Sequence, residues 1–295
     1  VQSLAVIAQL EHIGADRLRI VWNANSTFGF EHINFQRLAN SALITCVSRF
    51  MKWELSLGGA SALVIPNGIP ESIFNHPNPD DVARIRRACG GRLTLLKVGR
   101  FDADKRWLQA IEACAALRDA GAPVLLLMRG GREKDYEKVI LDRARSLFLR
   151  VDDIVLESPT AEALTSRIEQ TASSVDVLHI RSFLPDPLLF AMYGASDAVL
   201  ANSGREPFGL VGLEVMACGG VAIVGSTGED YATTLRNAIC VDSDNPEELT
   251  SLILRLSSDK SLRDRLVENG KITAKALTWS NAIDIIELKV GVSLP

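Results

Sequence analysis

Short apolar runs alternate along the chain with amphipathic stretches of helical length, and this alternation constrains the fold more than any other feature. The runs at 93–98 and 124–128 are typical of strands buried on both faces, and the stretches at 106–120 and 246–258 are typical of amphipathic helices. Strands that alternate with helices indicate βαβ units and a parallel sheet. The sequence therefore predicts an α/β protein.

A proline-rich stretch separates two series of such units. Pro70, Pro77 and Pro79 lie within ten residues of one another, and this spacing is typical of a linker. The pattern after it is long enough for a complete Rossmann-like domain, whereas the pattern before it covers only part of one. We predict a partial N-terminal Rossmann-like domain at 1–75, a linker at 76–91, a C-terminal Rossmann-like domain at 92–278, and a helix at 279–295 that packs back on the N-terminal part.

The length indicates that the first domain is incomplete. A chain of 295 residues corresponds to about two domains at roughly 150 residues each. Only about 75 residues precede the linker, and the chain begins at Val1 and not at a methionine. We therefore expect that the first part of the N-terminal domain is missing from it.

Composition excludes several classes of function. The 32 Lys and Arg residues and 36 Asp and Glu residues give a net charge of −4 without a dense basic block, so we expect no nucleic-acid partner. The five cysteines form no CxxC pair and the four histidines show no metal-binding spacing, which predicts buried thiols and no metal site. No run of 18 apolar residues is present, so we expect no transmembrane segment and a cytoplasmic protein, at most peripheral at the membrane.

Two cations follow the first strand expected in the C-terminal domain. Gly99 and Arg100 come directly after that strand, and Lys105 follows five positions later. In an open parallel sheet, ligands bind outside the carboxyl ends of the strands, and a guanidinium with an ammonium group can clamp a diphosphate. The alternative is a solvated loop on which the lysine and its neighbour only face Asp102 and Asp104.

A second segment, EPFGLVGLE at 206–214, follows the strand expected near residue 200. Pro207 suits the first turn of a helix, where its missing N–H costs nothing. The free amides of Phe208, Gly209 and Leu210 would then bind an anion, and the glycine would let a phosphate or sugar approach closely.

Two glutamates bracket this segment. Glu214 is the only charge between Pro207 and Val224, and a carboxylate in a buried stretch is costly unless it is paired or binds a ligand. Its alternative role is a buried ion pair with an arginine. Glu206 lies at the mouth of the expected helix, where the alternative role is simple capping.

Two other nucleotide-binding patterns do not fit. The spacing from Gly204 to Gly209 is that of a P-loop, but Leu210 and Val211 stand where Lys and Ser or Thr are required. No GxGxxG follows the strand at 93–98. An ATPase and a simple Rossmann oxidoreductase are therefore disfavoured.

These motifs together resemble the retaining glycosyltransferases of family GT4. The matching pieces are Gly99-Arg100 with Lys105, the Glu206-x7-Glu214 pair, Met216-Ala-Cys-Gly219, Ser48 at a strand end, and Val64-Ile-Pro-Asn-Gly68. The resemblance covers residues from about 19 to 290, and its Glu-x7-Glu segment is its most specific part. It implies the GT-B architecture of two Rossmann-like domains that face a cleft.

The resemblance implies a role for each matching residue. Arg100 and Lys105 would contact the diphosphate of a nucleotide-sugar donor, and Glu206 would accept hydrogen bonds from the sugar. The amides of Phe208–Val211 would hold phosphate and sugar, and Glu214 would bind the ribose. The family transfers the sugar to a sugar, lipid or small-molecule acceptor without a metal or other cofactor, with attack on the face that the leaving group departs from.

Departures from the family pattern leave a second reading open. Residues 227–230 replace the usual Gly-Gly segment, 151–180 are longer and more polar than expected, and neither His12 nor His32 stands in the family's histidine context. The first strand of the family, with its acceptor loop, precedes what is present here. The chain is therefore either a glycosyltransferase or a nucleotide-sugar-binding module that needs the missing part, a partner chain or a homo-oligomer for transfer.

Overall fold

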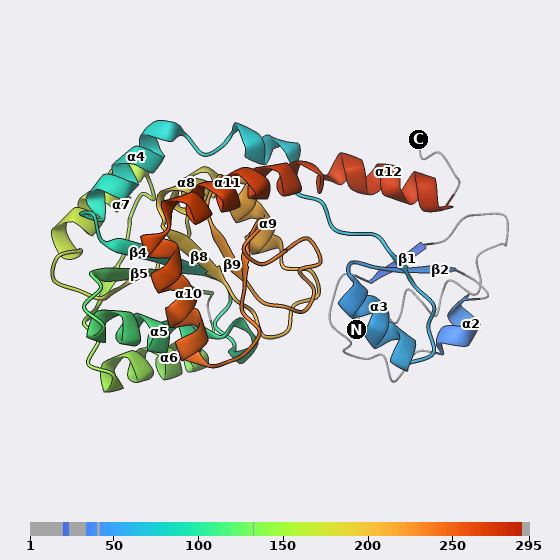
Figure 1. Ribbon diagram of the computed structural model, residues 1–295, viewed down its shortest axis with the longest axis horizontal. Helices are drawn as coiled ribbons and strands as arrows, with labels where there is room; N and C mark the ends of the chain where they lie inside the picture. Colours follow the sequence, from blue (N-terminus) through green and yellow to red (C-terminus); the bar gives the residue numbers. More distant parts are fainter. Residues whose placement is uncertain (1–19, 24–33, 40–41, 132, 291–295) are drawn as a thin grey trace.

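The computed structural model of the chain describes residues 20–23, 34–39, 42–131 and 133–290. They form a large C-terminal domain and a smaller N-terminal part, and the linker and the last helix join the two along one edge (Figure 1). Within the described ranges, no helix is both long enough and apolar enough to span a bilayer.

A parallel sheet of seven strands forms the centre of the C-terminal domain, as the alternation predicts. The strands lie in the order β10-β9-β8-β4-β5-β7-β6. In that order they are Ile239–Cys240, Ala222–Val224, Ala198–Ala201, Leu93–Val98, Val124–Arg129, Val177–Ile180 and Val151–Ile154. Because β5 lies on one side of β4 and β8 on the other, the strand order reverses beside β4, and the carboxyl ends of β4 and β8 open a ligand crevice.

Helices cover both faces of this sheet. Successive strand residues point to opposite faces, and the neighbours Leu95 and Leu96 of β4 accordingly belong to separate buried clusters. Side chains of α5, α6 and α10 share the cluster of Leu95, and those of α4, α7, α8 and α9 share the cluster of Leu96. The helices are α4 (Pro79–Ala88), α5 (Trp107–Asp119), α6 (Lys134–Ser146), α7 (Ala161–Thr171), α8 (Asp186–Ala195), α9 (Leu210–Ala217), α10 (Pro246–Ser258) and α11 (Lys260–Lys275).

The N-terminal part holds a parallel sheet of three described strands, in the order β1-β2-β3. The elements of this part are β1 (Ile20–Asn23), α2 (Phe35–Ala39), β2 (Leu43–Cys46), α3 (Arg49–Leu57) and β3 (Leu63–Val64). Ser48 caps α3, since its Oγ accepts a hydrogen bond from the Met51 amide at 3.1 Å. The sequence predicts a helix here, because Ser is a favoured N-cap residue and Phe50, Trp53 and Leu57 follow at helical spacing. The structure confirms this helix as α3.

The stretch expected as a linker contains a helix of the C-terminal domain, α4, which packs on α7 and α8. Pro79 occupies its first turn, and the Asn78 side chain accepts a hydrogen bond from the Asp80 amide at 2.9 Å. Proline is favoured at the start of a helix because its missing N–H needs no partner there. The proline here begins a helix, whereas the sequence reading took it only as a mark of irregular chain.

The last helix, α12 (Trp279–Val290), follows the linker back towards the N-terminal part (Figure 1). The Ile69 amide donates to the Leu277 carbonyl at 2.9 Å, and the Trp279 amide donates to the Ile69 carbonyl at 3.2 Å. At the far end of α12, the Lys289 Nζ donates to the Val64 carbonyl at 2.5 Å. These bonds connect the last helix and the residues before it to Ile69, ahead of the expected linker, and to β3.

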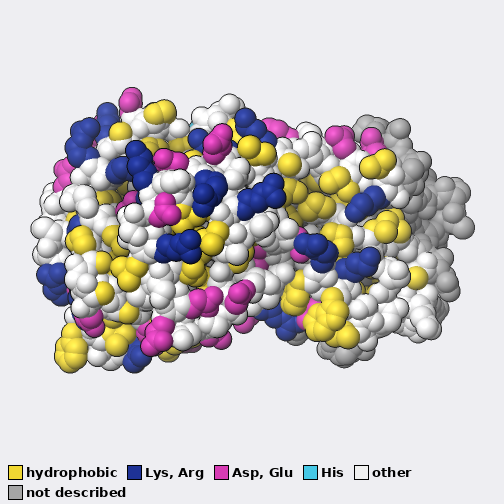
Figure 2. All heavy atoms as spheres, viewed as in Figure 1, with side chains coloured by type: hydrophobic (Ala, Val, Ile, Leu, Met, Phe, Trp, Pro, Cys, Tyr) yellow, Lys and Arg dark blue, Asp and Glu magenta, His cyan; other side chains and the backbone are white. Residues whose placement is uncertain are grey.

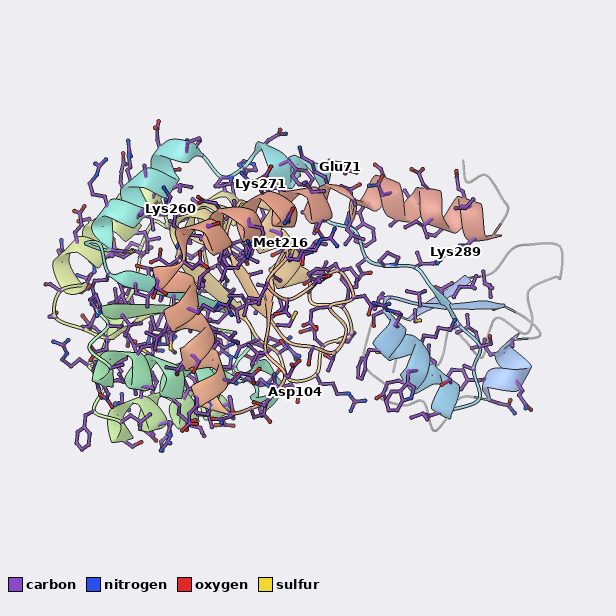
Figure 3. All side chains as sticks on the ribbon, viewed as in Figure 1. Glu71, Asp104, Met216, Lys260, Lys271 and Lys289 are labelled. Atoms are coloured by element: carbon purple, nitrogen blue, oxygen red, sulfur yellow. The ribbon has the colours of Figure 1, made fainter. Side chains whose placement is uncertain are left out.

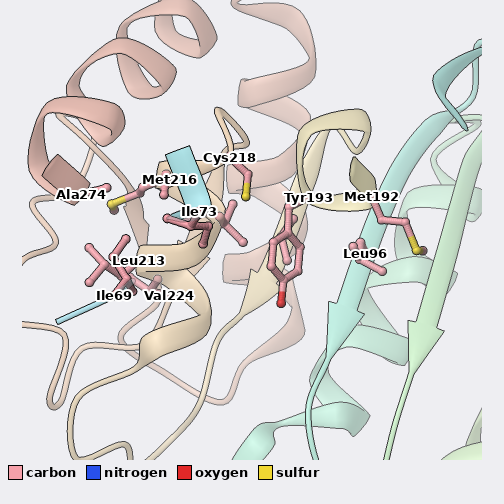
Figure 4. Packing of buried hydrophobic residues seen from close by; sticks show 14 of the residues in the cluster. Ile69, Ile73, Leu96, Met192, Tyr193, Leu213, Met216, Cys218, Val224 and Ala274 are labelled. Atoms are coloured by element: carbon pink, nitrogen blue, oxygen red, sulfur yellow. The ribbon is translucent and has the colours of Figure 1, made fainter. Parts of the chain in front are cut away.

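The core of the C-terminal domain extends into the segment just before the expected linker. Figure 4 shows Ile69 and Ile73 beside Leu213 and Met216 of α9, and all four side chains are buried. Residues 69–73, at the end of the predicted N-terminal part, therefore contribute buried apolar surface and are packed on the C-terminal domain. Four of the five cysteines, all of them unpaired thiols, are buried in the two cores, as the composition predicts.

Candidate functional site

A cavity of about 310 Å³ lies at the carboxyl ends of β4 and β8. Its walls include eight of the nine predicted site residues: Gly99, Arg100, Lys105, Glu206, Phe208, Gly209, Leu210 and Val211. Asn67 of the N-terminal part also lines it. Two loops separated by about a hundred residues of sequence thus meet at one place, because β4 and β8 are neighbours in the sheet.

Lys105 and Glu206 form an ion pair in this cavity. The Lys105 Nζ donates to the Glu206 Oε2 in a short contact, and both side chains are largely buried. The Glu206 backbone is held from the other side, because its amide donates to the Thr227 Oγ1 at 2.9 Å. The Thr227 hydroxyl in turn donates to the Glu206 carbonyl at 3.3 Å. A cation and a carboxylate are therefore fixed side by side within the cavity.

Arg100 is placed differently from Lys105. Its guanidinium pairs with the Asp102 Oδ2 at 3.1 Å, and its side chain is 72% exposed. The alternative, in which Lys105 and Arg106 only face Asp102 and Asp104, is not what the structure holds, because these two cations pair with Glu206 and Asp244. Arg106 does not line the cavity and pairs with Asp244, so Lys105 is the largely buried cation of this loop in the cavity wall.

Helix α9 begins later than the sequence predicts. Its first residue is Leu210, and Gly209 is its N-cap with φ 77° and ψ 57°. Pro207 and Phe208 precede the helix, so the prediction that Pro207 lies in its first turn is wrong. A left-handed residue cannot continue a right-handed helix, and this conformation at Gly209 stops α9 from extending backwards. Leu210 and Val211 line the cavity and form the first turn of α9, where backbone amides have no partner within the helix.

Glycine at 209 is required twice over. A Cβ there would lie 2.6 Å from the Glu229 Cγ, and the backbone conformation is one that L residues rarely adopt. We expect Gly209→Ala to lower the free energy of unfolding by about 1–3 kcal/mol and to weaken anion binding at this helix start. Gly59→Ala is the matched control, because Gly59 has φ 83° and open space around its added Cβ. Urea unfolding of both variants isolates the contact with Glu229, and equal losses would contradict it.

Glu214 lies on α9, outside the walls of the cavity. Burial raises the pKa of its carboxyl to about 7, and the Tyr193 hydroxyl donates to its Oε2 at 3.4 Å. No arginine among the described residues pairs with it, so the alternative of a buried ion pair is not what the structure holds. The carboxylate remains available to accept hydrogen bonds from a ligand.

A buried lysine, Lys97, lies at the floor of the cavity and was not singled out from the sequence. It is 2% exposed on β4, and its Nζ donates to the Asn202 Oδ1 at 2.6 Å and to the Leu200 carbonyl at 3.2 Å. Burial lowers its pKa well below the usual value. The lysine thus ties the end of β4 to the end of β8. Its signal in the sequence is a charge in the middle of an apolar run.

Glu229 is the second residue that sequence reasoning missed. It is 5% exposed, its Oε2 accepts a hydrogen bond from the Thr227 amide at 3.2 Å, and its Oε1 has no partner in the described part of the chain. Burial raises the pKa of this carboxyl to about 8, and the nearby Glu206 adds to the effect. The sequence showed only that residues 227–230 depart from the family pattern.

Two contacts close the site from the N-terminal side. The Arg49 amide, at the start of α3, donates to the Asp230 Oδ2 at 2.6 Å. Arg205 pairs with the Glu54 Oε2 at 2.8 Å, and its guanidinium lies 5.7 Å from the centre of the Phe50 ring. Helix α3 therefore contacts the loops on both sides of the cavity.

Nowhere in the described ranges do three or more His, Cys, Asp or Glu residues gather as a metal site would require. His12 and His32 lie outside the described residues.

Comparisons with known proteins agree with this geometry. Residues 83–273 match the sequence family described as "Glycosyl transferases group 1". The GDP-mannose-dependent alpha-(1-6)-phosphatidylinositol dimannoside mannosyltransferase of Mycobacterium tuberculosis is 26% identical over 254 residues, which are 84% of this chain and 57% of that protein. A D-inositol 3-phosphate glycosyltransferase of Geodermatophilus obscurus is 27% identical over 231 residues, which are 75% of this chain and 45% of that protein. The chain spans about half the length of these relatives.

Solved structures show the same architecture. The Anabaena protein HepE in complex with UDP-glucose superposes with a TM-score of 0.73 and 19% identity, over 99% of this chain and 77% of that one. The trehalose-6-phosphate synthase OtsA superposes with a TM-score of 0.68 and 14% identity, over 99% of this chain and 77% of that one. These likenesses support the GT-B fold. With the family match over more than half of its length, the chain belongs to the group 1 glycosyltransferases.

Proposed function

We propose that the chain binds a nucleotide-diphosphate sugar in the 310 Å³ cavity and transfers its sugar to a sugar, lipid or small-molecule acceptor. The observation that carries this proposal is the Lys105–Glu206 pair beside the first amides of α9. A diphosphate needs a cation and N–H donors, and a sugar needs an acceptor for its hydroxyls. The cavity offers all three within one space.

In the reaction, the bond between the sugar C1 and the diphosphate oxygen breaks, and the acceptor oxygen bonds to C1 on the same face. The acceptor proton passes to the departing phosphate oxygen, and the anomeric configuration is retained. Lys105, Arg100 and the amides of Leu210 and Val211 would offset the negative charge that grows on the leaving group. On this proposal the charge is balanced by the protein, and no metal ion or other cofactor takes part.

Donor binding would exchange one ion pair for another. In the empty cavity Lys105 is held by Glu206, and a diphosphate competes for the same ammonium group. Glu206 is then released to accept hydrogen bonds from hydroxyls of the transferred sugar. Glu214, buried and without a cationic partner in the described part of the chain, would accept hydrogen bonds from the ribose.

Titration calorimetry with UDP-glucose, GDP-mannose and ADP-glucose tests the proposal. We expect one of these donors to bind at one site per chain, and the preferred base then identifies the donor class. NAD⁺ and NADP⁺ serve as controls for a Rossmann oxidoreductase. Binding of a nicotinamide dinucleotide with none of the nucleotide sugars would contradict the proposal.

A second function, a binding module without transfer activity of its own, is favoured by one observation. The chain spans only 57% and 45% of the two relatives described above, so the acceptor side would come from another segment, a partner chain or a second copy. If the chain binds the donor but neither transfers the sugar nor slowly hydrolyses the donor, the result favours the module. Hydrolysis of the bound donor by the isolated chain favours the enzyme.

A further inference from the structure

A larger cavity, of about 950 Å³, lies on the C-terminal domain apart from the donor site. It is bounded by the linker, by α4, by the ends of α8 and α9, and by α11, and it shares no residue with the 310 Å³ cavity. Ala217, Cys218 and Gly219 of the Met216–Gly219 segment line one end of it, but the proposed transfer reaction makes no use of it. We refer to it as the basic groove.

Four cations line the basic groove, namely Arg86 and Arg87 of α4 and Lys271 and Lys275 of α11. Among the described residues of its wall there is no Asp or Glu. The whole chain has a net charge of −4, so a groove with cations alone is unlike its average surface. Figure 2 shows Lys and Arg side chains spread over this face, where α4 and α11 lie.

Lys271 and Lys275 are one turn apart on α11, and like charges at this spacing repel each other. Neither side chain has a hydrogen-bond or ion-pair partner elsewhere in the described chain, and the same holds for Arg87. Arg87 differs in this from most of the described arginines, which pair with a carboxylate or a carbonyl, as Arg263 does with Asp197 at 2.6 Å. A bound anion would relieve the repulsion between the two lysines.

Two of these cations, Arg86 and Lys271, lie against the neighbouring backbone. The Arg86 Nη2 donates to the Gly194 carbonyl at 2.8 Å, and its Nε donates to the Ala195 carbonyl at 3.3 Å. These two bonds fix the guanidinium, and Nη1 has no hydrogen-bond partner among the described residues. Lys271 lies across Gly219, where an added Cβ would come 2.8 Å from the lysine Cε. The Lys271 stem therefore occupies space that a larger residue at 219 would take.

Apart from His76, the remaining wall is mostly apolar, with Phe74, Pro77, Val82 and Ala217. A ligand that fills the groove therefore needs an anionic end and an apolar or ring-bearing part. A phosphate group suits the anionic end, since guanidinium binds phosphate oxygens in pairs and ammonium adds a compact charge.

We propose that the basic groove is a second binding site, for a phosphorylated ligand whose phosphate is held by Arg87, Lys271 and Lys275. The phosphate belongs either to a soluble phosphate ester or to the headgroup of an anionic lipid. The proposal is independent of the reaction at the donor site, because the two cavities share no residue.

Pyrophosphate binding to the full chain tests the site, in a Lys105→Ala background that weakens binding at the donor cavity. We expect Lys271→Gln with Lys275→Gln to weaken pyrophosphate binding at least about tenfold, since two charge-assisted contacts are lost. The matched control is Lys138→Gln with Lys260→Gln, which removes two exposed lysines outside the groove. Lys260 lies on the same helix as Lys271 (Figure 3), so the control also reports on α11 itself.

Vesicle sedimentation identifies the source of the phosphate. Vesicles of phosphatidylglycerol, with phosphatidylcholine as the neutral control, are incubated with the parent, groove and control variants. The groove variant is Lys271→Gln with Lys275→Gln. If this variant no longer sediments with phosphatidylglycerol vesicles while the parent and the control variant still do, the result supports a lipid headgroup. Groove-dependent pyrophosphate binding without sedimentation supports a soluble ester. Equal behaviour of the groove and control variants towards both probes, including no binding by either, overturns the proposal.

Discussion

Lys105→Ala is expected to lower kcat/KM for sugar transfer, or for donor hydrolysis, on the order of 100-fold to 1,000-fold, because a charge that stabilises the leaving diphosphate is lost. The lysine is the loop cation that reaches into the cavity, whereas Arg100 is mostly exposed and paired with Asp102. We therefore expect Arg100→Ala to have the smaller effect of the two. Kinetics over a range of donor concentrations separate lost binding from lost catalysis.

Glu206→Ala tests the other half of the pair. On the proposed function it removes contacts with the transferred sugar, so donor sugar binding should weaken more than binding of the free nucleotide diphosphate. Lys138→Ala, on the exposed surface of α6, is the control for loss of a lysine. Full activity in both Lys105→Ala and Glu206→Ala, with thermal unfolding unchanged, would contradict the assignment of this cavity as the donor site.

The fold could be predicted because its determinants are local. The apolar run at 93–98 is buried on both faces and coincides with β4 from end to end, and Asn245 and Pro246 mark the start of α10. The start of α9 was predicted wrongly because it depends on a single backbone conformation at Gly209. A glycine permits that conformation without requiring it, so the sequence does not distinguish the two possible starts.

The two loops of the site could each be predicted from the sequence. Their contact could not, because it depends on the order of the strands in the sheet. Each cavity loop follows a strand, but the contact between Lys105 and Glu206 requires that β4 and β8 be neighbours, across 100 residues of sequence. The burial of Lys97 and Glu229 has the same origin. Each becomes buried only when segments far apart in the sequence close over it, so composition and spacing do not reveal its environment.

Glu229 is the residue through which we expect pH to act on this protein. Its carboxyl is 5% exposed and contacts the Gly209 turn from behind, with one oxygen unpartnered among the described residues. The charged groups that act on it are Glu206, which raises its pKa, and Lys105, which lowers it. Tyr231 is a further titratable neighbour, and its pKa is raised well above the usual value, chiefly by burial.

The sign of the effect follows from the raised pKa. The carboxyl titrates near 4.5 when unfolded and near 8 in the folded chain, so the folded state binds the proton more tightly. Its contribution to stability is complete below pH about 4.5 and is lost as the pH rises to about 8. The whole loss amounts to a value on the order of 5 kcal/mol, at 1.36 kcal/mol for each unit of pKa.

Glu229→Gln should remove this dependence, because the amide imitates the neutral acid. We expect urea unfolding to show the variant more stable than the parent above pH 8, with the difference vanishing towards pH 4.5. Glu214→Gln is the matched control, since Glu214 titrates near 7 and the loss of its own contribution to stability is complete by about that pH. Ionised Glu229 would also place a second negative charge beside Glu206, so donor affinity should fall above pH 8 in the parent and persist in the variant. Parallel stability profiles for Glu229→Gln and the parent from pH 5 to 9 would show that this carboxyl is ionised in the folded protein at neutral pH.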